Sequence, residues 1–498
     1  MNSKDFMKIS LKKITLAPAK QGCDLGDGSE RAEYVNQDYI LNKLGRPHRN
    51  VNIMYTYYPH DKQWPQRISL ACKDMKINYQ WDYPYDDYPC YGQNGEPFNQ
   101  MRDIRRHGQD VLLTLTIDCA CTDEELIQIA NDLRPYGNLK LRINHECMGN
   151  WFTHNQRFSH KEVGAFFVRF ARILKKNAPN VKTIFCAGYA GEDGKVDHEE
   201  DFLEAYKTAD IWSADCYLAL HHGWPFDIAE KNGGRWTVSS VEDYYKRFEK
   251  TWKRLTEITG QKKPLMTAEF NTDGDVVGAE NCAKSVIAFE KIFKNHGAAE
   301  WFGGVSLYQF RDRGRLGLEM EDANCGIEQP LLAEYKKLIH EEYFKPHIVE
   351  ENDKLADYAD CTGKLNWSFE WRGSENATGL QLNILLEKKP VFFEMTVNQN
   401  IGLMIECNGT WFYKATHVQT VDLQRAFWKQ PLAKEGVKVN IFAPPADGLN
   451  IQDGNPDWAE CYRTTLVKMP EFRIRYEAVA EVGESLKMID FPVKNNTN

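Results

Sequence analysis

The pattern of hydrophobic and polar positions differs between two regions of the chain. From about residue 50 to residue 343, short apolar runs alternate with longer segments whose apolar residues recur at helical spacing. The strands expected in this region are 51–55, 77–81, 111–117, 139–144, 183–187, 211–217, 264–270 and 304–310. Eight strands with helices between them predict a parallel (β/α)₈ barrel of the α/β class.

Helix boundaries support this pattern. Ser159 and Glu162 have the spacing of a capping box and precede an apolar stripe, while Thr122 precedes a helical turn rich in acidic residues. A long helix is expected over 241–259, ending at Gly260. An open, doubly wound sheet is the competing fold, but no glycine-rich phosphate loop follows the first expected strand.

Beyond residue 343 the pattern changes to short strands separated by turns such as Asn408-Gly409. Such a pattern is typical of an antiparallel β-sandwich. The run 8–16 also has the character of a strand and has no partner in the barrel, so we expect it to add to the sandwich. The expected organisation is an N-terminal extension (1–45), a catalytic barrel (46–345) and an accessory β-sandwich (350–493).

Composition narrows the classes of partner. The net charge of −9 disfavours nucleic acid, whose binding requires a basic patch, and no apolar stretch reaches the length that spans a bilayer. The first residues lack the apolar segment of a signal peptide, so we expect a cytoplasmic protein, or a secreted one whose leader has been removed. The 13 cysteines lack CxxC spacing, which favours thiols in a reducing compartment.

Two glutamates stand at the ends of expected strands. Glu146 follows the fourth strand and Glu269 lies near the end of the seventh. Because a barrel builds its active site at the C-terminal ends of its strands, the two carboxyl groups should meet over the barrel mouth. Glycosidic cleavage needs such a pair, one protonated and one ionised, and a separation of about 5–5.5 Å implies retention of configuration. A single glutamate of this kind is explained equally well as a helix cap.

Neighbouring polar residues fit the same chemistry. Side chains alternate along a strand, so Arg142 and Asn144 should share the face of the first glutamate, and Asn271 that of the second. Arg142 and Asn144 can keep a carboxylate ionised or hold a sugar hydroxyl. Trp151 lies close to the first glutamate in sequence and should favour its neutral form by excluding water.

The segment 142–152 resembles the acid/base segment of glycoside hydrolase family 26, which contains β-mannanases. Glutamates that end strands four and seven are, more broadly, the hallmark of the clan A retaining barrel glycosidases. The resemblance implies that Glu146 is the acid/base and Glu269 the nucleophile. It also implies that His145 contacts the substrate or orients a neighbour, and that Tyr217, at the end of the sixth strand, hydrogen-bonds the nucleophile.

Loops after other strands carry further candidates for sugar binding. Rings with polar edges suit the faces of sugars, although a proline-stiffened, packed loop accounts for the first of these positions equally well. These candidates are Trp81, His221, His222, Trp224, Tyr308 and Gln309.

The sequence therefore predicts a retaining O-glycosyl hydrolase that acts on a β-linked oligo- or polysaccharide without a cofactor or a metal. One alternative is a barrel that binds carbohydrate without cleaving it. Another is a metal-dependent barrel hydrolase, although His145-Glu146 does not extend to His-Glu-x-x-His because position 149 is glycine. The sugar, the linkage and the oligomeric state are not encoded in any motif.

Overall fold

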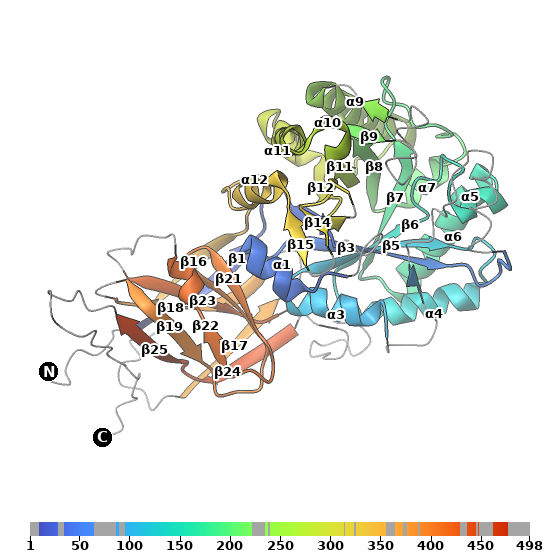
Figure 1. Cartoon of the computed structure of the whole chain (residues 1–498). Coiled ribbons are helices and arrows are strands. Elements are labelled where there is room, and N and C mark those ends of the chain that lie inside the picture. The colour runs from blue at the N-terminus through green and yellow to red at the C-terminus, as the bar shows by residue number, and fades with distance from the viewer. Residues whose placement is uncertain are drawn as a thin grey trace, which may run out of the picture.

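The computed structural model shows a barrel joined to a two-sheet β domain (Figure 1). It describes residues 9–27, 34–63, 86–88, 95–221, 235–237, 240–312, 314–322, 325–354, 364–371, 376–386, 389–428, 436–444, 447 and 462–476. The expected strand 77–81 lies outside these residues.

Eight parallel strands form a closed barrel, which confirms the predicted fold class. Each strand pairs with the next, and the shortest of them, β2, pairs with both β3 and β12 and so closes the ring. In order around the barrel the strands are β2 (Cys23–Gly26), β3 (Asn50–Tyr57), β5 (Asp110–Ile117), β6 (Leu139–Ile143), β7 (Val181–Tyr189), β8 (Ile211–Tyr217), β11 (Leu265–Asn271) and β12 (Phe302–Leu307).

The start of the barrel differs from the prediction. The expected first strand, 51–55, lies within β3, which is the second strand of the barrel, and the first strand is β2, inside the segment expected to precede the barrel. Only four residues form β2, and all are buried, so the strand has no alternating pattern. Its Asp24 is held by the side chains of Arg49 and Asn50. From the third strand onward, the expected and observed positions in the barrel agree.

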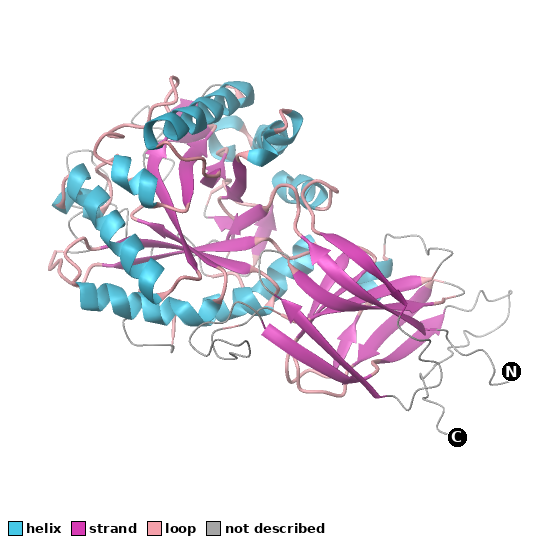
Figure 2. Cartoon of the chain, turned by 180° about the vertical axis from the view of Figure 1, so that it is seen from behind, coloured by secondary structure: helices cyan, strands magenta, loops and turns pink. Residues whose placement is uncertain are grey.

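Helices cover the outside of the barrel, as seen from behind in Figure 2. The predicted capping box forms between Ser159 and Glu162, and a second one forms between Thr122 and Glu125, where the sequence predicted only an acidic first turn. Among the described residues, no helix combines the length and the apolarity needed to cross a membrane. The helices of the barrel part are α1 (Gln37–Leu44), α3 (Phe98–Arg106), α4 (Asp123–Leu133), α5 (Thr153–Arg157), α6 (His160–Asn177), α7 (Leu203–Thr208), α9 (Val241–Thr259), α10 (Gly274–Val277), α11 (Ala279–Asn295) and α12 (Pro330–Ile339).

The second part contains two antiparallel sheets around a core of its own, as the sequence pattern predicted. The strand β1 (Ile9–Ala17) lies in the larger sheet between β16 (His347–Lys354) and β18 (Ala377–Ile384). The other strands of that sheet are β17 (Lys364–Trp371), β20 (Leu403–Cys407), β21 (Thr410–Lys414), β23 (Val437–Phe442) and β24 (Tyr462–Lys468). The smaller sheet consists of β19 (Pro390–Thr396), β22 (Thr420–Asp422) and β25 (Glu471–Tyr476).

A separate apolar cluster joins the two parts. Leu41 of α1 packs in this cluster with the buried Trp371, on the sheet face that meets the barrel. The turn after α3 fits against the same face, because a Cβ on Gly108 would lie 3.2 Å from the Trp371 ring. The ring of His107 lies 4.3 Å from that of Tyr413. The sandwich is therefore packed directly on the barrel's outer layer.

Trp371→Ala should test this contact. Removing a fully buried indole leaves a cavity, so we expect the free energy of unfolding to fall by about 3–5 kcal/mol. Trp428→Ala is the matched control, because Trp428 is 68% exposed and its loss should change stability by no more than about 0.5 kcal/mol. Denaturant titration of both variants measures the difference, and equal stabilities would contradict the packing described here.

Candidate active site

Three carboxyl groups converge at the C-terminal ends of the barrel strands. Glu269 lies on β11, Glu146 follows β6, and Asp215 lies on β8. One carboxylate oxygen from each lies within 4.8 Å of the others, and the three residues are 6%, 7% and 0% exposed, respectively. The two glutamates that the sequence singled out are thus brought together, along with an aspartate that it did not single out.

The chain turns sharply where β6 ends. Asn144 and Glu146 both have positive φ, 48° and 50°, so the alternation of side chains stops at Ile143. The Asn144 side chain accepts a bond from the Ile117 N–H (2.6 Å) and donates to the Ile117 carbonyl (3.1 Å). The expectation that Asn144 shares a face with Arg142 and Glu146 is therefore corrected: its amide fastens the turn to β5.

Arg142 links two of the carboxylates. Its fully buried guanidinium donates from Nη2 to Glu269 Oε1 (2.5 Å) and from Nη1 to Asp215 Oδ2 (3.2 Å). Its Nε donates to Thr114 Oγ1 (2.9 Å), which fixes the plane of the fork. The nearby carboxylates raise the pKa of Arg142 despite the burial that opposes its charge. The Arg142 guanidinium is therefore held between the carboxyl groups of Glu269 and Asp215.

Glu269 receives further contacts. Tyr217 Oη donates to Glu269 Oε2 at 3.2 Å, and the Glu269 backbone N–H donates to Asp215 Oδ1 at 3.1 Å. His145 Nε2 lies 3.7 Å from Glu269 Oε1. Burial, together with the positive charge of Arg142, lowers the pKa of His145 well below its usual value, so its imidazole is neutral. Glu269 thus faces donors on both of its oxygens.

Glu146 has the opposite environment. Burial, with repulsion from Glu269 and Asp215, raises its pKa to about 8. Hydrogen bonds from Tyr189 and from Trp151 Nε1, the latter 2.7 Å from Glu146 Oε2, offset part of this rise. The carboxyl group of Glu146 is therefore mostly protonated at neutral pH, beside a second glutamate with an arginine partner.

A glycine makes the contact of Trp151 possible. A Cβ on Gly149 would lie 2.1 Å from the Trp151 ring, so any larger residue would displace the indole that donates to Glu146. This accounts in structural terms for the short Gly-Asn-Trp segment after the acid.

The sequence analysis missed Asp215 and Tyr189. Asp215 stands two residues before Tyr217 on β8, so the alternation of a strand would have placed both on one face. Burial and repulsion from Glu269 raise the pKa of Asp215 to about 7, although Arg142 opposes this. Tyr189 is the last residue of β7, and that position at a strand end was its only signal.

Two other predicted site residues, Asn271 and Gln309, form hydrogen bonds within the protein. The side-chain amide of Asn271 donates to the carbonyls of Tyr308 and Leu316, and Gln309 Nε2 donates to Asp312 Oδ1 at 3.0 Å. These two buried amides hold the segment that follows β12, and the contact with a sugar expected for them stays a prediction.

Apolar and aromatic side chains form one wall beside the carboxyl groups. Buried Tyr217 and Tyr308 meet edge to face, with ring centroids 6.0 Å apart, and pack with Met54 and Phe152. Partly buried Trp151, Tyr189, Leu220 and Leu316 border this cluster. Trp81, His222, Trp224 and the side chain of His221 lie outside the described residues, and the roles expected for them stay predictions.

The charges at this site favour proton chemistry over a metal. Carboxylate oxygens are the ligands of hard cations such as Mg²⁺ and Ca²⁺, and three lie close together here. Arg142, however, already bonds both Asp215 and Glu269, while Glu146 retains a proton. The donor set is thus occupied by a guanidinium and a proton, as an acid–base pair requires.

Among known proteins, the chain is similar to solved structures at low identity. Neither a family model nor a curated protein matches the chain. Similar solved structures include a family 26 β-mannanase from Bacteroides ovatus, with 10% identity, coverage of 68% of this chain and 92% of that chain, and a TM-score of 0.38. An α-L-arabinofuranosidase from Thermotoga maritima has 12% identity, coverage of 87% and 99%, and a TM-score of 0.43. A family 39 glycoside hydrolase from Bacteroides cellulosilyticus has 10% identity, coverage of 85% and 81%, and a TM-score of 0.43. Scores this low assign neither a family nor a substrate.

Glu146→Gln should reveal the buried acid through stability. The pKa of Glu146 lies near 4.5 when unfolded and about 8 when folded, so the folded protein holds a proton that the unfolded chain has released. Wild-type stability therefore falls as pH rises from 4.5 to 8, relative to a glutamine that does not titrate. We therefore expect the Tm of Glu146→Gln minus the Tm of wild type to increase as the pH rises from 4.5 to 8.

Differential scanning fluorimetry at several pH values measures this gain. Glu300→Gln is the control, because Glu300 is exposed and its replacement should shift Tm equally at each pH. A difference between Glu146→Gln and wild type that stays constant with pH would refute the raised pKa.

Proposed function

We propose that the protein is a retaining glycoside hydrolase with Glu146 as acid/base and Glu269 as nucleophile. One observation carries the proposal: the carboxyl group of Glu146, whose pKa burial and repulsion raise to about 8, has an oxygen within 4.8 Å of a second glutamate that is bonded to arginine and tyrosine. This proximity matches retaining enzymes, whose two carboxyl groups lie about 5–5.5 Å apart, rather than inverting enzymes, in which about 6.5–9.5 Å separates them.

In the first step, a Glu269 oxygen attacks the anomeric carbon of the sugar. The glycosidic C–O bond breaks, and the proton of Glu146 passes to the leaving oxygen. Arg142 and Tyr217 orient the Glu269 carboxylate for this attack. The product of the step is a glycosyl ester on Glu269 and a free alcohol or shortened sugar.

In the second step, Glu146 acts as a base. Ester formation removes the negative charge of Glu269, which is one of the causes that raise the pKa of Glu146, so this carboxyl group remains ionised once its proton has left. Glu146 then takes a proton from water, whose oxygen attacks the anomeric carbon and breaks the ester bond. Free Glu269 and a sugar of retained configuration result.

Asp215 acts through its neighbours. It accepts bonds from Arg142 and from the Glu269 backbone N–H, so it positions the nucleophile without needing to touch the sugar. Neutral His145, packed on Phe152 with ring centroids 4.6 Å apart, can donate or accept a bond with a sugar hydroxyl near Glu269.

The substrate class is a β-linked oligo- or polysaccharide. The aromatic wall of Trp151, Tyr189, Tyr217 and Tyr308 supports a sugar, because flat rings with polar edges complement its apolar faces and hydroxyl groups. The resemblance of segment 142–152 to family 26 makes β-mannans and manno-oligosaccharides the first substrates to test.

Glu269→Ala should abolish most turnover of an aryl-glycoside and oligosaccharide panel, because no group remains to attack the anomeric carbon. Azide should restore part of the rate with activated aryl glycosides, since it enters from the face left open by the missing carboxylate. The expected product is a glycosyl azide of inverted configuration, identified by NMR.

Glu300→Ala is the matched control, because this exposed glutamate precedes β12 at the N-terminal end of that strand, and the variant should retain full activity. Equal activity of Glu269→Ala and wild type would overturn the assignment of the nucleophile. If folded wild type binds members of the panel without cleaving any of them, a carbohydrate-binding barrel replaces the hydrolase.

The pH profile gives a separate test of Glu146. The acid must be protonated in the free enzyme, so kcat/KM should fall as pH rises through about 8. Trp151→Phe removes a hydrogen bond that lowers the pKa of Glu146, and this alkaline limb should move to higher pH. A limb that stays in place in Trp151→Phe would contradict the assignment.

A further inference from the structure

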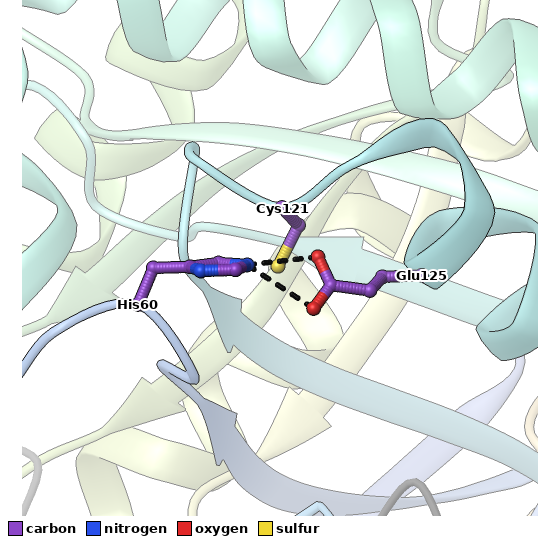
Figure 3. Close-up of side chains that lie close together, drawn as sticks. All are labelled: His60, Cys121 and Glu125. Carbon is purple, nitrogen blue, oxygen red and sulfur yellow. Dashed lines mark hydrogen bonds and ion pairs between the residues drawn. The ribbon is translucent and has the colours of Figure 1, made fainter.

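A second cluster of ionisable side chains lies at the same end of the barrel. The loop that follows β3, the loop that follows β5 and the first turn of α4 bring together His60, Cys121 and Glu125 (Figure 3). A nitrogen, a sulfur and a carboxylate oxygen from these residues all lie within 4.8 Å of one another. In Figure 3 the imidazole faces the carboxylate, and the thiol points to the space beside them.

The backbone around this cluster is fastened independently of the three side chains. Asp118 accepts a bond from the His60 N–H (3.2 Å) on Oδ2, and its carbonyl accepts the Cys121 N–H (3.1 Å). Arg157 donates to both Asp118 Oδ2 (2.5 Å) and the His60 carbonyl (3.2 Å). Both loops are thus tied to one aspartate–arginine pair, which holds the donor atoms near each other.

Glu125 is positioned by its helix. It is the third residue of α4 and accepts the Thr122 N–H at 2.7 Å, as part of the capping box. Its carboxylate also lies 2.9 and 3.1 Å from His60 Nε2. Burial opposes the charge of Glu125, but the hydrogen bonds from His60 and Thr122 outweigh it and lower its pKa. Cys121, which packs in the apolar core cluster of the barrel, brings its thiol beside this His60–Glu125 pair.

The three donors form a set that suits zinc. Thiolate, imidazole and carboxylate are the ligands that Zn²⁺ takes, whereas a sulfur disfavours Mg²⁺ and Ca²⁺. Tetrahedral zinc with its usual bond lengths separates such donors by roughly 3.4–3.6 Å. The His60–Glu125 contact needs to widen by about half an ångström from its 2.9 Å, a small change for side chains that are 40% and 27% exposed.

The charges also balance. A Cys121 thiolate and the Glu125 carboxylate together neutralise a divalent ion, while His60 contributes a neutral nitrogen. The exposure of His60 and Glu125 leaves access for water as a fourth ligand. Cys121 itself is only 1% exposed, so its sulfur would bind from the protein side of the ion.

We propose that His60, Cys121 and Glu125 bind a zinc-like transition-metal ion, with water as the fourth ligand. The site is distinct from the pair Glu146 and Glu269 and does not depend on the proposed glycosidase activity. Such an ion would cross-link the loops after the second and third barrel strands. It also departs from the sequence-based expectation that no metal is bound.

Cobalt titration of the full-length, chelator-treated protein tests the site directly. Co²⁺ bound to a thiolate absorbs strongly in the near ultraviolet, and tetrahedral Co²⁺ also shows visible bands. We expect one equivalent of Co²⁺ to produce both signals in wild type and one equivalent of Zn²⁺ to displace them. Zn²⁺ should also raise the Tm of wild type.

Ligand variants assign the signals. Cys121→Ser should abolish the near-ultraviolet band, and His60→Ala and Glu125→Gln should each weaken Co²⁺ binding at least about tenfold. Glu125→Gln keeps a side chain that can form the capping box, and His60 is exposed, so both substitutions spare the fold. Cys325→Ser, which removes an exposed cysteine elsewhere, is the control and should bind as wild type does.

Two results would overturn the proposal. One is the absence of a cobalt–thiolate band in folded wild type at an excess of Co²⁺. The other is a band that persists in Cys121→Ser with unchanged affinity in His60→Ala and Glu125→Gln, which would place the ion on other cysteines.

Discussion

Arg142 is the group on which the candidate active site depends. Three carboxyl groups within 4.8 Å of one another, all largely shielded from water, cannot all be ionised without large repulsion. The guanidinium bonds two of them, and the third keeps its proton. A single buried cation thereby distinguishes two carboxyl groups that hydrogen-bond to it from a third that does not, and its hydrogen bond to Thr114 ties this arrangement to the barrel wall.

Sequence periodicity predicted the parts of the fold that repeat. The strands from the third onward have long apolar runs, so Glu146 and Glu269 could be placed at strands four and seven without a structure. The four-residue β2 escaped detection because it is too short to show a period. Asp215 could have been found from its spacing to Tyr217, since both lie on one face of β8.

Interactions between distant segments could not be predicted in this way. The role of Asn144 depends on a backbone with positive φ, and Asn271 is directed to carbonyls that only the folded loop supplies. His60 and Cys121 follow different strands, and nothing in the spacing between them indicates that their side chains meet. Local pattern locates strand ends, whereas the partners of a polar side chain are decided by which loops the barrel brings together.

The place of β1 has a consequence for how the protein is made. Ile14 of β1 pairs with Glu350 on one side and with Gly379 on the other. Both partner strands follow the barrel in the sequence, so β1 can pair only after the whole barrel has been synthesised. Until then both of its edges are open, and Leu11, Ile14 and Leu16 have no sheet to cover them. A chain that ended with the barrel would leave β1 unpaired and its apolar side chains exposed. The larger sheet is therefore complete only after β16 and β18 have been synthesised and have paired with β1.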